Sequence, residues 1–379
     1  MPKPPPFPTM PPPPAESHPV DVAQALTEAL YAAIDRNVQS ARIIADAAAV
    51  PVGPTPREVV WALNKTKLYR YRPTQPVDPA QKKRVPLLLV YALINKPYIF
   101  DLRPGSSFIE YMVNEGFDVF LLDWGTPGLE DKNTTFDDYA TEYLPRAVRK
   151  MLKVAEAEEF SMLGYCIGAA LAVLYAALYP QAPLRNLMLL TAPLDFSRTD
   201  GSLFSTWLDP RFFDVDRMVN SLDNIPPEII EFGAKLLKPV ENFIGSYTTL
   251  YWDFADDPES VANWQAMHKW IHDGVPVSGA AFRQWVKEYI RANELIRSEH
   301  FVKGQRADLA NIQANFLNVV AKYDHIVPPH QSTTIMDQVG SQDKTLDIIP
   351  AGHVGLMGGR NARYKLWPKL AAWLAERSA

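Results

Sequence analysis

The apolar residues of this chain follow two different spacings. Short continuous apolar runs are separated by longer stretches in which apolar residues return every three or four positions. A continuous run is typical of a strand covered on both faces, and the longer spacing is typical of an amphipathic helix. Strands are predicted at 85–94, 118–123, 160–163, 186–190, 315–321 and 346–349. Helices are predicted at 107–115, 135–156, 169–179 and 368–377.

The order of these elements favours an α/β fold. Strands that alternate with helices imply a mostly parallel sheet joined by right-handed crossovers. Residues 58–71 alternate enough to predict a β-hairpin ahead of the first covered strand. The core of the fold is therefore expected in two pieces, 55–192 and 306–379.

Three stretches fall outside this alternation. Residues 1–19 hold ten prolines, which predicts a disordered or polyproline II tail, either passive or bound by a proline-recognising partner. Residues 20–54 predict an N-terminal helical segment that ends at a group of prolines. Residues 193–305 carry many aromatic side chains on helix-like segments. They predict a helical cap, or lid, inserted between the sheet strands, although an ordinary helical core fits the same pattern.

A sharp turn is predicted between the strand at 160–163 and the helix at 169–179. It holds Gly164, Tyr165, Cys166, Ile167 and Gly168, the pattern G-x-C-x-G. This is the nucleophile elbow of the α/β-hydrolase fold with cysteine in the serine position. Glycines relieve crowding in so tight a turn, and the N-terminus of the following helix favours a thiolate. The alternative is that Cys166 is one more small buried apolar residue.

Two further residues complete a catalytic order along the chain. The α/β-hydrolase order is nucleophile, acid, histidine, and here it is matched by Cys166, Asp324 and His353. Asp324 and His353 each follow an apolar strand closely, at the sheet edge where such folds place their sites. His353 would take the proton of the thiol, and Asp324 would orient the imidazole. Other aspartates compete for the role of the acid: Asp101, Asp123 and Asp195.

Supporting groups are expected around this triad. Two backbone N–H groups should stabilise the oxyanion, that of Ile167 and one from the loop near Ile94 or Asn95. His325 is expected to support the local network, not to act as the base.

Composition narrows the function further. The chain has 379 residues, a net charge of −5 and a single cysteine. It has no basic excess for nucleic acid, no possible internal disulfide, and too few thiols for a zinc–thiolate site. No apolar run reaches the length of a membrane span and no secretory signal is visible, so a cytoplasmic location is expected. Because cysteine passes an acyl group between thioesters at little energetic cost, Cys166 favours acyl transfer from a donor such as acyl-CoA.

Several segments together resemble the polyhydroxyalkanoate synthases, over roughly residues 55–375. The short N-terminal region is most like that of the class III and class IV catalytic subunits. The matching segments are VPLLLVYALINKPYIFDLRP at 85–104, GFDVFLLDWGTPG at 116–128, the box at 164–168, TAPLDF at 191–196, DHIVPP at 324–329 and the Gly-His pair at 352–353.

The resemblance implies an activity and its setting. The substrate would be an (R)-3-hydroxyacyl-CoA, such as 3-hydroxybutyryl-CoA, and the products a polyester and free CoA. Cys166, Asp324 and His353 would form the triad, and Cys166 would carry the growing chain as a thioester. No cofactor or metal is expected. The family further implies a homodimer, a small non-catalytic partner subunit and a location at the surface of cytoplasmic polyester granules.

Two alternatives remain open on these residues. A cysteine-dependent thioesterase or other hydrolase could use the same triad, and a non-catalytic granule-associated module could carry it unused. The sequence also departs from the family at Ala169 and Ala170, where a further glycine is usual. An added methyl group there could tighten the packing of the elbow helix or shift the oxyanion geometry.

Overall fold

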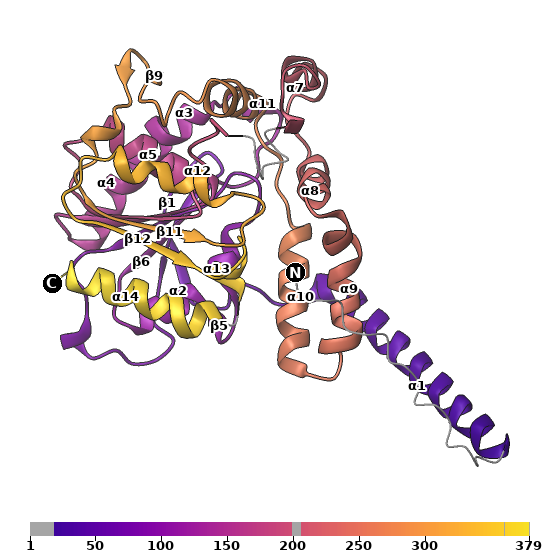
Figure 1. Cartoon of the computed structure of the whole chain (residues 1–379). Coiled ribbons are helices and arrows are strands. Elements are labelled where there is room, and N and C mark those ends of the chain that lie inside the picture. Colours follow the sequence, from indigo (N-terminus) through magenta and orange to yellow (C-terminus); the bar gives the residue numbers. More distant parts are fainter. Residues whose placement is uncertain (1–18, 199–205, 360, 379) are drawn as a thin grey trace.

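The computed structural model describes residues 19–198, 206–359 and 361–378, and a single large sheet runs through its centre (Figure 1). The strand order in this eight-stranded sheet is β1-β2-β6-β3-β7-β8-β11-β12. The first two pairs are antiparallel and all later pairs are parallel, which confirms the expected mostly parallel sheet. The strands are β1 Arg57–Leu63, β2 Thr66–Tyr71, β3 Leu87–Val90, β6 Val119–Asp123, β7 Phe160–Tyr165, β8 Leu184–Leu190, β11 Asn315–Ala321 and β12 Lys344–Ile349.

Two strand predictions were wrong at their C-terminal ends. The strand expected at 85–94 stops at Val90, and the chain continues as a loop. In this loop the Ile94 carbonyl accepts a hydrogen bond from the Val275 backbone N–H at 3.0 Å. Residues 91–94 are apolar because the loop is buried between the sheet and the inserted segment, not because they are strand. The strand expected at 160–163 continues to Tyr165, directly before the cysteine.

Helices cover both faces of the sheet, so the core has three layers. Helices α4 and α5 pack on one face in one large apolar cluster, and α2 and α14 pack in a second cluster on the other face. The helix expected at 135–156 forms with a π-helical interruption at Tyr139–Tyr143. The helices are α2 Phe108–Asn114, α3 Phe136–Asp138, α4 Leu144–Ala155, α5 Ile167–Leu178, α12 Pro329–Thr333, α13 Gly355–Gly358 and α14 Trp367–Glu376.

The helix expected in the N-terminal segment is confirmed as α1, Pro19–Asp46. It projects from the body in Figure 1, and hydrogen bonds towards its C-terminal end fasten it there. Gln39 donates to the Ala255 carbonyl at 2.6 Å, and Gln265 donates to the Ile43 carbonyl at 2.9 Å. Within the described residues no helix combines the length and apolarity that a membrane span requires. The prediction of a proline-rich tail lies outside the described residues, apart from Pro19.

A largely helical segment connects β8 to β11, two strands that are neighbours in the sheet. This agrees with the helical character expected of 193–305, whereas the division of the chain into core and cap stays a prediction. A short hairpin near its end was not anticipated, nor was a second one, β4 Asp101–Arg103 with β5 Ser106–Ser107. The elements of the segment are α7 Val215–Leu222, α8 Pro227–Leu236, α9 Ser246–Thr249, α10 Pro258–His272, α11 Gly279–Gln284, β9 Phe301–Val302 and β10 Gln305–Arg306.

The inserted segment contacts the loop that follows β3. Trp270 donates from its indole N–H to the Lys96 carbonyl at 2.9 Å, and the Tyr98 hydroxyl donates to Asp273 at 2.7 Å. Asn95 also forms an isolated bridge with Gly274. The segment is therefore held against the loop from which one oxyanion donor was expected.

Candidate active site

Cys166 lies at the turn between β7 and α5, as the motif predicts. Its backbone has φ 56° and ψ −129°, a conformation that non-glycine residues adopt only when the surroundings impose it. Close packing of the backbone at Gly164 and Gly168, on either side of Cys166, imposes it here. A Cβ on Gly164 would collide with the Ala169 backbone, and a Cβ on Gly168 would collide with the carbonyl groups of Val90 and Tyr91. The elbow therefore requires glycine at both positions.

The two alanines that depart from the family pattern fit within the elbow helix. Ala169 and Ala170 are completely buried in the apolar cluster that α5 shares with the sheet. The Ala169 N–H donates to the Cys166 carbonyl at 2.9 Å, so the first turn of the helix closes around the nucleophile position. Helix α5 is continuous from Ile167 to Leu178, so both alanines are accommodated without a break in the helix.

Asp324 and His353 come together at the carboxyl ends of β11 and β12. His353 Nδ1 and Asp324 Oδ2 are 2.7 Å apart, and both residues are buried. The other carboxylate oxygen, Oδ1, accepts backbone hydrogen bonds from Ile326 at 2.9 Å and Val327 at 2.8 Å. The carboxylate is thus held by its own loop through Oδ1, and Oδ2 contacts the imidazole of His353.

The thiol of Cys166 is the second neighbour of His353. Burial by itself lowers the pKa of His353, but the charges of Asp324 and Cys166 and the side-chain hydrogen bonds to both outweigh it. The net effect raises the pKa of His353 from 6.5 to about 10. Such a site favours an imidazolium, held between the Asp324 carboxylate and the Cys166 sulfur. The structure therefore brings all three predicted triad residues together.

The competing aspartates have other partners. Asp101 accepts hydrogen bonds from Thr55 and Ser107. Asp123 accepts from the Gly125 backbone. Asp195 accepts from Ser197, Asn293 and Thr334. Each set of contacts holds a turn or joins two segments, so among the four candidates Asp324 is the acid placed against His353.

The expected supporting groups lie around the triad. Ile167 is the first residue of α5, so its N–H has no acceptor within the helix. The side chains of Ile94 and Ile167 both pack against the apolar cluster that contains Cys166. Asn95 follows in the same loop. Burial, followed by the charge of Lys238, lowers the pKa of His325, which therefore faces the inserted segment as well as the triad.

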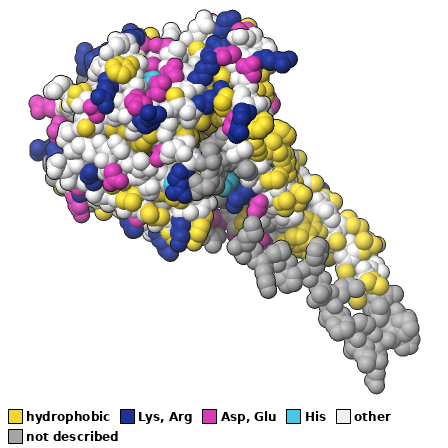
Figure 2. Space-filling model, turned by 45° about the horizontal axis from the view of Figure 1, so that its top comes forward, with side chains coloured by type: hydrophobic (Ala, Val, Ile, Leu, Met, Phe, Trp, Pro, Cys, Tyr) yellow, Lys and Arg dark blue, Asp and Glu magenta, His cyan; other side chains and the backbone are white. Residues whose placement is uncertain are grey.

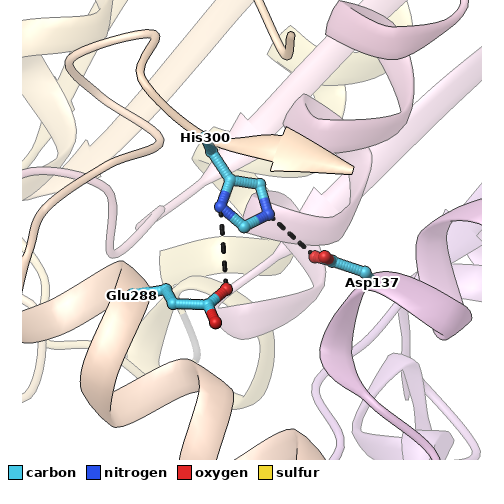
Figure 3. A group of neighbouring side chains, drawn as sticks. All are labelled: Asp137, Glu288 and His300. Atoms are coloured by element: carbon cyan, nitrogen blue, oxygen red, sulfur yellow. Dashed lines mark hydrogen bonds and ion pairs between the residues drawn. The ribbon is translucent and has the colours of Figure 1, made fainter. Parts of the chain in front are cut away.

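A separate group of ionisable side chains joins the inserted segment to the core (Figure 3). His300 Nε2 is 2.9 Å from Asp137 Oδ1, and its Nδ1 is 3.1 Å from Glu294 and 3.8 Å from Glu288. The ligand atoms of Asp137, Glu288 and His300 lie within 4.8 Å of one another, close enough to hold a metal ion. Both imidazole nitrogens already have carboxylate partners, and the Tyr289 hydroxyl donates to Asp137 at 2.8 Å. The group is therefore explained as an ion-pair network that fastens the insertion.

This network should make stability depend on pH. Burial lowers the pKa of His300, but Asp137 and the neighbouring glutamates raise it by more than burial lowers it. The net pKa therefore lies above 6.5. The stabilisation is complete below pH 6.5 and is lost as the pH rises through the raised value. We expect His300→Gln to lower the unfolding free energy by about 3 kcal/mol at about pH 6, and by less at about pH 9. Denaturant unfolding at both pH values measures this, with His272→Gln, an exposed histidine at the end of α10, as the control. An equal deficit at the two pH values would contradict the assignment.

Comparison with known proteins agrees with this geometry. The family profile described as the alpha/beta hydrolase fold matches residues 85–359. Monoacylglycerol lipase of Paleococcus ferrophilus superposes with a TM-score of 0.52 at 16% identity, over 83% of this chain and 100% of the lipase. A soluble variant of monoglyceride lipase from Saccharomyces cerevisiae gives 0.53 at 12% identity, over 88% and 98%. At these identities the likeness establishes the α/β-hydrolase fold.

Sequence relatives identify the family within that fold. The profile for the N-terminus of poly-beta-hydroxybutyrate polymerase (PhaC) matches residues 29–112. The poly(3-hydroxyalkanoate) polymerase subunit PhaC of Allochromatium vinosum is 35% identical over 88% of this chain and 92% of the relative. That of Haloferax mediterranei is 36% identical over 87% of this chain, which spans 65% of the relative's length. The chain therefore belongs to the poly(3-hydroxyalkanoate) polymerase family.

Proposed function

We propose that this chain polymerises (R)-3-hydroxyacyl-CoA, with 3-hydroxybutyryl-CoA as the expected monomer, into polyhydroxyalkanoate with release of CoA. The observation that carries the proposal is the buried Cys166–His353–Asp324 arrangement at the elbow. It occurs in a chain that shares 35% of its residues with a polymerase subunit over nearly the whole length of both.

The first step would transfer the acyl group to the enzyme. The Cys166 thiolate attacks the thioester carbonyl carbon of the acyl-CoA, and the carbonyl oxygen becomes an oxyanion. Backbone N–H groups of Ile167 and of Ile94 or Asn95 would stabilise that oxyanion. As it collapses, the bond to the CoA sulfur breaks, and the departing sulfur takes the proton that His353 holds. The products are an acyl thioester on Cys166 and free CoA.

The second step would form the ester bond of the polymer. The 3-hydroxyl oxygen of another hydroxyacyl group attacks the thioester carbonyl on Cys166, and its proton passes to His353. The carbon–sulfur bond then breaks, and the Cys166 thiolate is restored beside the imidazolium. Asp324 would keep the imidazole in the orientation that both steps need. No metal or cofactor is required, since the CoA thioester supplies the activated acyl group.

An exposed apolar surface on α1 supports the further proposal that the chain associates with a partner. The projecting part of α1 exposes an apolar stripe, and Figure 2 shows apolar side chains along this arm. Exposed apolar surface of this extent is typical of an association site. A second copy, a small non-catalytic subunit or the surface of a cytoplasmic polyester granule would each cover it. The stripe consists of Leu26, Leu30, Tyr31, Ile34 and Val38.

Product analysis tests the proposed activity. Incubation with 3-hydroxybutyryl-CoA should release CoA together with an insoluble polyester that accounts for the consumed acyl groups. Free 3-hydroxybutyrate in equal amount to the CoA, without polymer, would instead identify a thioesterase. A chain that releases no CoA with any 3-hydroxyacyl-CoA would fit a non-catalytic granule-associated module and contradict the proposal.

A further inference from the structure

Tyr165, the last residue of β7 and the direct neighbour of Cys166, contacts His353 in two ways. Its hydroxyl donates a hydrogen bond to the His353 backbone carbonyl at 2.9 Å. Its ring stacks on the imidazole, with the ring centroids 5.5 Å apart and the planes inclined by 24°. One side chain next to the nucleophile therefore holds both the backbone and the ring of the histidine.

The ring of Tyr165 is itself fixed by the core. It is completely buried, and aromatic neighbours surround it on other sides. The Tyr91 ring lies 5.5 Å away between centroids, and the Phe100 ring lies 5.9 Å away in an edge contact. A packed aromatic ring of this kind cannot shift without moving its neighbours. The side chain acts as a rigid spacer between β7 and the histidine loop.

His353 has few other constraints along its backbone. It lies in the short connection between β12 and α13, where its carbonyl receives one other hydrogen bond, from the Leu356 N–H at 3.4 Å. Asp324 binds only Nδ1 and so sets the rotation of the imidazole. The Tyr323 N–H holds the start of the connection at the Ala351 carbonyl, and the contact from Tyr165 ties His353 itself to the elbow strand.

We propose that Tyr165 is a positioning residue that fixes the separation between the Cys166 thiol and the His353 imidazole through its hydrogen bond to the His353 carbonyl. The inference rests on the proposed function of these two residues. Tyr165 is covalently adjacent to Cys166. A contact from its side chain to His353 therefore fixes where the base lies relative to the nucleophile. The hydroxyl contributes the directional contact, and the ring contributes the spacing.

Removing only the hydroxyl should loosen this link. Tyr165→Phe keeps the packed ring but leaves the buried His353 carbonyl with the long contact from Leu356 alone. Displacements of a fraction of an ångström between reacting groups lower turnover strongly. We expect kcat for CoA release from 3-hydroxybutyryl-CoA to fall about 10- to 100-fold, with KM within about twofold of the parent value. Tyr165→Leu, which also removes the ring, should lose more.

Alkylation of Cys166 gives a second readout that does not require polymer formation. Cys166 is the only thiol, so iodoacetamide reports on it alone. In Tyr165→Phe the imidazole would be less well placed against the sulfur, and the profile of alkylation rate against pH should differ from that of the parent chain. Tyr175→Phe is the matched control. Tyr175 is likewise buried and aromatic, but it packs on the Phe160 side of the sheet.

The outcomes separate positioning from mere structural support. A lower kcat together with a displaced alkylation profile in Tyr165→Phe, with Tyr175→Phe unchanged, supports the proposal. Parent values of kcat and of the alkylation profile overturn it. A loss of activity that only follows the folded fraction in thermal unfolding, with a parent alkylation profile, also overturns it. Full CoA release by Cys166→Ala would instead refute the proposed function, whatever Tyr165→Phe does.

Discussion

Replacing Cys166 by alanine is expected to lower CoA release by at least about 10⁴-fold, because in the proposed mechanism this sulfur carries the acyl chain. The chain has no second cysteine, so no neighbouring thiol can substitute. The folded state should survive, since alanine fits a site that is already buried in an apolar cluster. The measurement is CoA release from 3-hydroxybutyryl-CoA, together with thermal unfolding of the same sample.

Cys166→Ser provides the matched variant, because it keeps the shape of the nucleophile and changes only its chemistry. A hydroxyl beside His353 is far less ionised than a thiol, and an acyl serine is a more stable ester. We expect less than about 1% of the parent rate of polymer formation. A parent rate in Cys166→Ala would show that the acyl group is carried elsewhere. A parent rate in Cys166→Ser would show that the reaction does not need a thioester at this position.

The second large effect is expected from Asp324→Asn. The amide cannot stabilise the imidazolium and can present its N–H₂ group to Nδ1, which favours the wrong tautomer. By analogy with triad enzymes in general, kcat should fall about 10³- to 10⁴-fold. The pKa of His353 should also fall from its raised value towards 6.5, because burial then acts without the opposing carboxylate.

The pH dependence distinguishes this effect from simple damage to the fold. Residual activity of Asp324→Asn should decline at lower pH on the alkaline side than activity of the parent chain. Asp123→Asn is the control, since Asp123 also lies at the carboxyl end of a strand but its carboxylate accepts from the turn at Gly125 and not from His353. Equal losses in Asp324→Asn and Asp123→Asn would contradict the assignment of the acid.

The sequence was sufficient for the parts of the site that are local. Cys166 lies in a turn whose two glycines are required by immediate neighbours, and Asp324 lies in the loop that follows β11. The α/β-hydrolase fold and the polyhydroxyalkanoate family followed from the same segments, and both are confirmed. The grouping of Cys166, Asp324 and His353 was predicted, whereas their catalytic roles remain proposals.

The parts that sequence could not supply depend on distant contacts. The role of Tyr165 arises from a residue 188 positions away, and its place in the G-x-C-x-G motif was the only available signal. The end of β3 at Val90 was missed because the buried loop continues the same apolar run. The pairing of Asp137 with His300 joins residues 163 positions apart, and neither periodicity nor spacing indicates it.

The inserted helical segment leaves and re-enters the sheet at adjacent strands, and this has a consequence for how the family can diversify. β8 and β11 are paired directly from Asn186↔Asn315 onward, and the two asparagine side chains are bonded at 2.9 Å. The sheet register is therefore set without the insertion. A replacement for this segment would leave the β8–β11 pairing in place but would have to supply a partner for Asp137. Chimaeras joined at these two strands are therefore expected to keep the sheet and the Cys166–His353–Asp324 arrangement.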